Sequence, residues 1–294
     1  MPGNVPPRRR SGAVLLIAPC LLLLAVFAYR PVLRSIELSL YGSDLLGRPT
    51  RFVGLDHFVA LGTDPALRKA LLVTIAITVL STALATGGAL AAALPLRRAA
   101  RRGRAVVTVV LSLPFAFSAA AASAVFAGLF APAVGTLNEV LAVVGIDGPP
   151  WLQSQAWAVV AIVVATAWYE FGFAFLVVLA ALRQLDGSML EAAALDGAGE
   201  WRTAISIIVP ALRPSLLFLV VTQTMSGLQV FTQVQVLTRG GPGGSTSTLV
   251  YELYRRAFGE GVPDYGSAST MALTLLVLVL VVTALQFRLT RSAA

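Results

Sequence analysis

The chain has 294 residues, of which 57% are apolar and 12% are charged, and its formal net charge is +8 at pH 7. Soluble domains average about 45 to 50% apolar and about 25% charged residues, so this composition excludes an ordinary soluble domain and predicts a membrane protein. A single cysteine, Cys20, and a single histidine, His57, exclude a disulfide framework and a metal centre built from these residue types.

The distribution of charge and the motif content narrow the class further. The arginines stand beside apolar blocks instead of forming a basic face with exposed aromatic residues, which indicates membrane topology and no nucleic-acid partner. The sequence has no GxxxxGK[ST] phosphate loop, so ATP that drives the protein must be bound by a partner. Because the sequence offers no set of acid, base and nucleophile, no catalytic residue is predicted.

The first residues resemble a secretory signal. Residues 1–11 contain three prolines and the run Arg8 to Arg10, which predicts a disordered cytoplasmic tail before a single transmembrane domain at 12–294. An apolar block follows at once, but Pro19 precedes Cys20 where a lipoprotein cleavage site requires a small residue. We therefore expect an uncleaved first span.

Six apolar blocks are long enough to cross about 30 Å of hydrocarbon. They lie at about 13–29, 70–94, 105–130, 156–182, 214–236 and 269–287, with a mixed-charge segment at 31–68. Pro114 is expected to bend the third block, because proline removes one helix hydrogen bond. The sequence therefore predicts an all-α membrane protein with six transmembrane helices.

Two connecting loops set the expected orientation. The loop after the second block carries five arginines, whereas residues 131–155 contain no lysine or arginine. The positive-inside rule makes the first loop cytoplasmic and places the second outside, together with residues 237–268. Both termini are then inside. The five residues are Arg97, Arg98, Arg101, Arg102 and Arg104.

A polar segment at 186–212 lies between the fourth and fifth blocks. Apolar residues at three- and four-residue steps predict helix, and Gly197 and Gly199 interrupt the pattern. We expect a short helix with Glu191 near its start, a glycine bend, and a second helix that enters the membrane. The apolar side holds Leu190, Ala194, Ala198, Trp201, Ile205 and Ile208; the other side holds Glu191, Asp196, Glu200 and Arg202.

This segment resembles the EAA loop of permease subunits in binding-protein-dependent ABC importers, carbohydrate-uptake branch. Ala204, where an aromatic residue is usual, and Asp186-Gly187, in place of an Ile-Pro pair, depart from the family pattern. The stretch from Gly135 to Leu152 and the outer loop motif Gly240, Gly241 and Pro242 also resemble this branch. The matching positions of the loop are Glu191, Ala192, Ala193, Asp196, Gly197, Ala198, Trp201 and Pro210.

The resemblance implies a type I permease fold in the cytoplasmic membrane of a prokaryote. It implies that segment 186–212 docks on a cytoplasmic ATPase and transmits ATP-driven movement to the spans. It further implies two ATPase subunits that bind ATP and Mg, a second permease in a heterodimer, and an extracytoplasmic solute-binding protein. The implied solute is a sugar, an oligosaccharide or a related polyol.

Polar residues in the fourth and fifth blocks are candidates for a translocation path. Glu170 is expected near the middle of the fourth block, where it could accept hydrogen bonds from solute, relay a proton or form a structural pair. Trp168, Phe171 and Phe175 lie on nearly the opposite helix face and are expected to pack or face lipid. Four polar residues of the fifth block share one arc, which predicts either a path or contacts between helices. They are Thr222, Ser226, Gln229 and Gln233.

Two other classes of protein compete with the importer. A secondary transporter would use Glu170 as a proton carrier, but the sequence has no internal repeat of the kind that many such transporters contain. An intramembrane catalyst would need paired chemical groups that are absent from the sequence. The identity of the solute and whether the permease pair is homomeric or heteromeric do not follow from the sequence.

Overall fold

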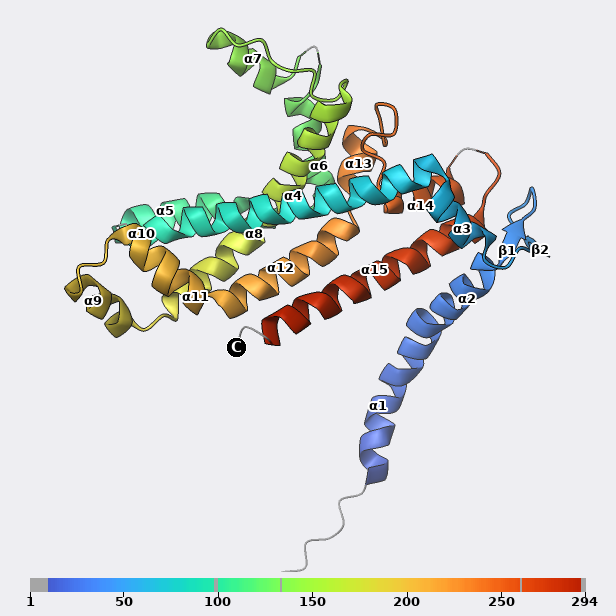
Figure 1. Ribbon diagram of the computed structural model, residues 1–294, viewed down its shortest axis with the longest axis horizontal. Helices are drawn as coiled ribbons and strands as arrows, with labels where there is room; N and C mark the ends of the chain where they lie inside the picture. The colour runs from blue at the N-terminus through green and yellow to red at the C-terminus, as the bar shows by residue number, and fades with distance from the viewer. Residues whose placement is uncertain (1–9, 98–99, 133, 260, 292–294) are drawn as a thin grey trace, which may run out of the picture.

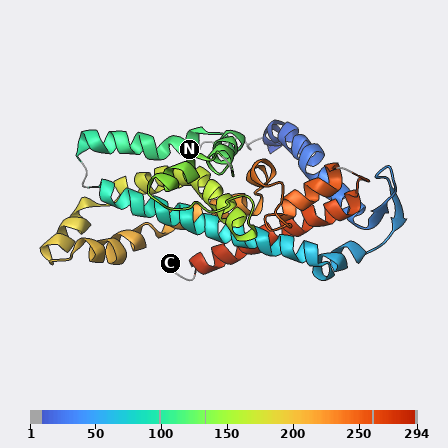
Figure 2. The ribbon, with the colours of Figure 1, turned by 90° about the horizontal axis from the view of Figure 1, so that it is seen from above.

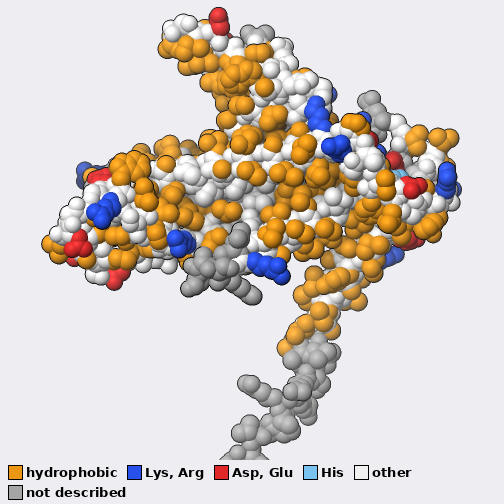
Figure 3. Space-filling model, in the orientation of Figure 1, with side chains coloured by type: hydrophobic (Ala, Val, Ile, Leu, Met, Phe, Trp, Pro, Cys, Tyr) orange, Lys and Arg blue, Asp and Glu red, His pale blue; other side chains and the backbone are white. Residues whose placement is uncertain are grey.

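The computed structural model describes residues 10–97, 100–132, 134–259 and 261–291. The predicted tail at 1–11 lies almost wholly outside the described residues, and Arg98 lies outside them as well. The structure is a group of long, tilted helices from which the N-terminal helix and the segment α6 to α7 project in different directions (Figure 1). Hydrophobic side chains cover most of the visible face between the ends of the long helices (Figure 3). This surface fits a protein embedded in lipid and among other membrane subunits.

The first apolar block belongs to a longer helix than predicted. Helix α1 (Arg10–Leu24) continues through a π-helical turn (Ala25–Tyr29) into α2 (Arg30–Ser39). The helix continues past Tyr29 through Pro31, which has no N–H to donate, and the π-helical turn just before it, where the Arg30 N–H donates to the Ala25 carbonyl, accommodates the proline. Side chains from Leu16 to Tyr29 are all exposed within this chain. This apolar helix therefore needs lipid or another membrane subunit around it.

The connection at 31–68 contains a small hairpin that the sequence did not predict. Strand β1 (Tyr41–Ser43) pairs antiparallel with β2 (Pro49–Phe52), and Tyr41 stands opposite Phe52. Helix α3 (Asp56–Thr63) follows. His57 Nε2 lies 3.2 Å from the carbonyl oxygen of Tyr41, so this histidine connects α3 to the hairpin. The all-α expectation otherwise holds.

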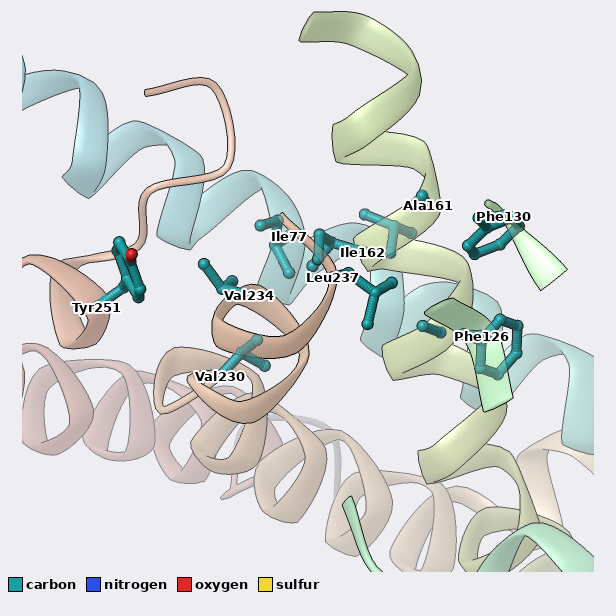
Figure 4. Close-up of a cluster of buried hydrophobic side chains, with 11 residues drawn as sticks. Ile77, Phe126, Phe130, Ala161, Ile162, Val230, Val234, Leu237 and Tyr251 are labelled. Carbon is teal, nitrogen blue, oxygen red and sulfur yellow. The ribbon is translucent and has the colours of Figure 1, made fainter. Parts of the chain in front are cut away.

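Four long helices form the centre: α4 (Pro65–Leu96), α8 (Gln155–Arg183), α12 (Arg213–Leu228) and α15 (Tyr265–Arg291). Helices α4 and α8 pack closely because small side chains line their interface, including the fully buried Ala89, Ala93 and Ala174. Toward the other end, Ile77 of α4 and Ile162 of α8 join Phe126 and Val234 in a second cluster (Figure 4). Among the described residues, four helices are long and apolar enough to span, or six if each of two bent helix pairs, one of which contains α12, counts as one span; the four are Leu16–Ser39, Pro65–Leu96, Gln155–Arg183 and Tyr265–Arg288.

The third block bends at the predicted place, and the bend is large. Helix α5 (Arg101–Ser112) leads into a 3₁₀ turn (Leu113–Ala116), and α6 (Ala119–Leu129) then starts in a new direction. The axes of the two segments differ by 102°. Pro114 supplies no N–H to continue α5, while Ser118 accepts a hydrogen bond from the Ala121 N–H and so caps α6. The expected continuous span at 105–130 is therefore a broken one.

The fifth block follows one sharp bend and is broken once within its predicted bounds. Helix α10 (Glu200–Thr203), a π-helical turn (Ala204–Ile208) and α11 (Val209–Ala211) precede α12 at an angle of 69°. Helix α12 ends at Leu228, and α13 (Thr232–Leu237) follows as a separate segment. The two segments expected outside contain α7 (Thr136–Val143) and α14 (Leu249–Phe258).

We predict that the arginine-rich loop and α7 lie on opposite sides of the membrane. Single cysteines at Gly103 and Asp147, in a Cys20→Ser background, test this. Gly103 has open space for a side chain and Asp147 is exposed, whereas a side chain at Gly148 would run into Asn138. A thiol reagent that cannot cross the membrane should label Asp147→Cys from outside and Gly103→Cys only in inverted vesicles. Labelling of both positions from the same side would contradict this topology.

Candidate functional site

A cavity of about 270 Å³ lies between α8 and α12. Three of the polar residues that the sequence singled out meet there, namely Glu170, Thr222 and Ser226. The other lining residues are Phe115, Tyr169, Phe173 and Gln223. The cavity thus combines one carboxylate, neutral hydrogen-bonding groups and aromatic rings, which is the usual lining of a site for a small polar molecule.

Glu170 is the only ionisable carboxylate of the cavity lining and is 6% exposed. The Ser226 hydroxyl lies close enough to interact with it, but neither carboxylate oxygen has a hydrogen bond of standard geometry within the described residues. A buried carboxylate without a partner is costly, so natural sites retain one where another molecule or water completes it. Within the described part of the chain, Glu170 therefore has no ion-pair partner, and Ser226 is the one side chain close enough to pair with its carboxylate.

Gln223 is a functional candidate that the sequence reading missed. Its side chain is buried, accepts a hydrogen bond of 2.6 Å from Thr86 Oγ1, and lies 3.5 Å from the Glu170 carbonyl oxygen, to which its amide donates. Gln223 thereby links α4, α8 and α12 around the cavity. The sequence offered one indication of its role, because Gln223 is a polar residue directly after Thr222 of the predicted arc. Its partner Thr86 is 137 residues away, so local spacing could not identify this contact.

The aromatic part of the cavity is positioned by a glycine. The rings of Phe115 and Phe173 stack with centroids 5.8 Å apart. Gly172 lets α8 approach the 3₁₀ turn that carries Phe115, because a side chain there would contact the Phe115 backbone nitrogen and Pro114. The bend in the third block thus places the Phe115 ring at the cavity.

The aromatic residues on the other face of α8 pack within the protein, as predicted. Trp168 contacts the rings of Phe117 and Phe126 edge-on. Phe171 stacks on Phe175, which is fully buried. This face of α8 therefore does not line the cavity.

The predicted four-residue arc is wrong beyond Ser226. Because α12 ends at Leu228, the helical spacing does not extend to Gln229 or Gln233. Gln229 is exposed and donates to the Met225 carbonyl at 3.1 Å, whereas Gln233 is buried in α13, and neither lines the cavity. The break is stabilised from outside the segment, since Thr248 Oγ1 donates to the Val230 carbonyl at 2.9 Å.

The polar segment at 186–212 has the predicted form of helix, bend and helix. Helix α9 (Gly187–Leu195) ends at a Schellman motif in which Ala198 N–H donates to the Ala193 carbonyl and Gly197 N–H to the Ala194 carbonyl. Gly197 adopts a φ of +72°, which an L-residue adopts only with strain. The chain then turns into α10, and the segment protrudes from one end of the molecule (Figure 1).

The start of α9 differs from the expectation. Glu191 is the fifth residue of the helix, so it lies past the first turn, where the helix dipole acts most strongly. Asp186 takes the terminal position and accepts a hydrogen bond of 2.9 Å from the Ser188 N–H. This backbone hydrogen bond, with a further contribution from the Ser188 side chain, holds the pKa of Asp186 below its ordinary value. The capping carboxylate is therefore ionised at neutral pH.

The surface of the 186–212 segment is apolar as well as charged. Leu195 and Trp201 are 89% and 80% exposed, and Glu191 and Asp196 are exposed beside them. Of the residues expected on the apolar side, Ile208 alone is fully buried in the described chain. Such an exposed apolar surface with a charged rim is typical of a protein contact.

Comparison with known proteins decides the family. The family described as "Binding-protein-dependent transport system inner membrane component" matches residues 83–294. The chain belongs to this family. It is therefore a permease subunit, and the 186–212 segment and the cavity between α8 and α12 both lie within the matched region.

Relatives of this permease extend over nearly the whole chain. It is 34% identical over 277 residues to the lactose transport system permease protein LacF of Rhizobium radiobacter, covering 93% of this chain and 92% of the relative. It is 34% identical over 288 residues to the sn-glycerol-3-phosphate transport system permease protein UgpA of Escherichia coli O157:H7, covering 97% and 96%.

A solved structure shows the same fold. A chain of a bacterial alginate ABC transporter, crystallised with an alginate pentasaccharide-bound periplasmic protein, superposes with a TM-score of 0.83 at 22% identity, covering 97% of this chain and 96% of that one. The fold is thus that of ABC transporter permeases, as the sequence predicted.

The outer loop of the permease packs against its own chain. Gly240 has a φ of +80°, and a side chain there would come within 2.7 Å of the Tyr251 ring. Thr246 Oγ1 donates to the Gly241 carbonyl at 2.8 Å, and residues 245–248 are buried. The Gly240, Gly241 and Pro242 motif therefore shapes an ordered loop that packs within this chain.

Proposed function

We propose that this permease forms one wall of the path by which an ATP-driven importer carries a sugar or related polyol across the cytoplasmic membrane. The observation that carries the proposal is the cavity lined both by the Glu170 carboxylate, which has no hydrogen bond of standard geometry within the described residues, and by the stacked rings of Phe115 and Phe173. A sugar supplies hydroxyl donors for the carboxylate and the C–H face of its ring for the aromatic side chains. Relatives named for lactose, sn-glycerol-3-phosphate and sulfoquinovosyl glycerol transport support this solute class.

The proposal includes partners on three sides. The exposed segment at 186–212 docks on a cytoplasmic ATPase through Glu191, Asp196 and Trp201, and two such subunits bind the ATP and Mg. A second, different permease covers the open side of the cavity, and an extracytoplasmic solute-binding protein delivers the solute. The crystallised alginate transporter, with its periplasmic protein bound, supports the last of these partners.

Reconstitution tests this function. The chain should be purified with its partners from native membranes, the partners identified by mass, and the complex placed in proteoliposomes. Labelled lactose and sn-glycerol 3-phosphate serve as first probes, each with the co-purified binding protein. The proposal predicts that ATP on the side of the membrane that carries the ATPase subunits drives solute transport to that side. It also predicts that solute-loaded binding protein stimulates ATP hydrolysis. Uptake driven by a proton gradient without ATP would instead support a secondary transporter that uses Glu170.

A further inference from the structure

A second cavity, of about 470 Å³, lies at the end of α5 and α8 that the topology places in the cytoplasm. Its lining residues are Arg104 and Ala105 in the first turns of α5, Thr108 one turn further on, and Arg183 at the last position of α8. The two guanidinium groups thus come from different helices and converge on one space. This cavity is distinct from the one that contains Glu170.

The polar groups of this second cavity are suited to an anion. Arg104 and Arg183 have no ion-pair partner among the described residues, which include every acidic residue except Glu260. Thr108 Oγ1 is buried and, within the same residues, has no hydrogen-bond partner. Guanidinium groups bind phosphate oxygens with two parallel hydrogen bonds, and a hydroxyl can supply a third.

The surroundings of this cavity indicate a lipid as the source of the phosphate. Val106, Val109 and Val110 of α5 are exposed beside it, so an apolar helix face begins where the basic cavity ends. Figure 2 shows α5 at the opposite edge of the molecule from α9 and α10, which form the proposed ATPase contact. Basic pockets between helices at the cytoplasmic side of a membrane protein are suited to anionic lipid headgroups.

We propose that Arg104, Arg183 and Thr108 bind the phosphodiester headgroup of an anionic phospholipid of the cytoplasmic leaflet, with its acyl chains along the exposed valines of α5. The assignment to the cytoplasmic leaflet rests on the proposed orientation. The binding itself does not depend on transport, so it can fail while the importer proposal stands.

Native mass spectrometry of the detergent-purified transporter tests the site. Dioleoyl phosphatidylglycerol is titrated against dioleoyl phosphatidylcholine for the wild type, Arg104→Gln, Arg183→Gln and the double variant. Each substitution should weaken phosphatidylglycerol retention roughly fivefold, because one basic residue contributes about that factor near an anionic lipid, and phosphatidylcholine retention should not change. Arg213→Gln is the matched control, because Arg213 is an exposed cytoplasmic arginine that does not line the cavity.

Further measurements distinguish a bound lipid from a free anion or a partner subunit in this cavity. Thr108→Val should lower phosphatidylglycerol retention while leaving the melting temperature of the complex unchanged. Unchanged retention in the double variant, or an equal loss in Arg213→Gln, would overturn the proposal. Displacement of the lipid by millimolar inorganic phosphate would assign the site to a free anion. Loss of the second permease from Arg104→Gln at unchanged lipid content would make the cavity a subunit contact.

Discussion

Gly197→Pro should abolish solute uptake while leaving the protein in the membrane. Gly197 has a φ of +72°, whereas proline holds φ near −65°, so the bend between α9 and α10 cannot form. The substitution also removes the N–H that donates to the Ala194 carbonyl in the Schellman motif. Because the exposed 186–212 segment is the proposed ATPase contact, the variant should also release the ATPase during purification.

Two further variants distinguish the effect of the backbone bend from the effect of the exposed side chains of α9. Gly199→Ala is the matched control, because Gly199 has a φ of −65° and open space around it, and it should transport like the wild type. Glu191→Lys leaves the backbone unchanged but reverses an exposed charge on α9, and it should weaken ATPase retention without loss of membrane insertion. Uptake rate, ATPase recovery and the amount of permease in the membrane are measured together. Wild-type uptake by Gly197→Pro at wild-type abundance would remove the coupling assignment.

Glu170→Gln should raise the half-saturation concentration for uptake roughly tenfold, because a hydrogen bond to a charged group contributes about 1.5 to 3 kcal/mol and a neutral amide contributes less. The substitution preserves side-chain size, and Glu170 has no intramolecular hydrogen bond of standard geometry to lose within the described residues. Assembly should therefore be unchanged. Ser226→Ala, at the opposite wall of the same cavity, should have a smaller effect in the same direction.

The control for Glu170→Gln uses Gln229 and Gln233, the two residues of the predicted arc that do not line the cavity. Gln229→Leu combined with Gln233→Leu should leave the half-saturation concentration unchanged and only slightly weaken assembly, as for membrane hydrogen bonds that contribute about 0.6 kcal/mol. Uptake is measured against solute concentration in an ATPase background that works without the binding protein, so that delivery does not set the result. A larger shift in the double leucine variant than in Glu170→Gln would place the path elsewhere.

Hydropathy and charge predicted the spans well because the bilayer imposes a length and a composition that are visible in sequence. The fourth block, expected at 156–182, is α8 at Gln155–Arg183. The glycine bend at Gly197 was also predictable, since a residue without a side chain is favoured at a positive φ. The same reasoning singled out Glu170, Thr222 and Ser226, which the structure brings to one cavity.

The remaining features depend on contacts between distant parts of the chain. Pro114 indicated a bend, but its size follows from the Ser118 cap and from the contact of Gly172 with the turn that carries Phe115. The end of α12 at Leu228 is held by Thr248, 18 residues beyond the freed Val230 carbonyl. Extrapolation of helical spacing through that break misplaced Gln229 and Gln233, and local spacing could not identify Thr86 as the partner of Gln223.

The most direct test of the ATP-driven importer is a cross-link from the exposed segment to its proposed partner. Ala192 of α9 is exposed and follows Glu191, so Ala192→Cys in a Cys20→Ser background presents a thiol at the proposed contact. A photoactivatable thiol reagent in native membranes should join this position to a cytoplasmic ATPase, identified by mass, and added nucleotide should change the yield. Asp147→Cys should give no such product. An Ala192→Cys variant that transports normally but never cross-links to an ATPase would contradict the coupling of this permease to ATP hydrolysis.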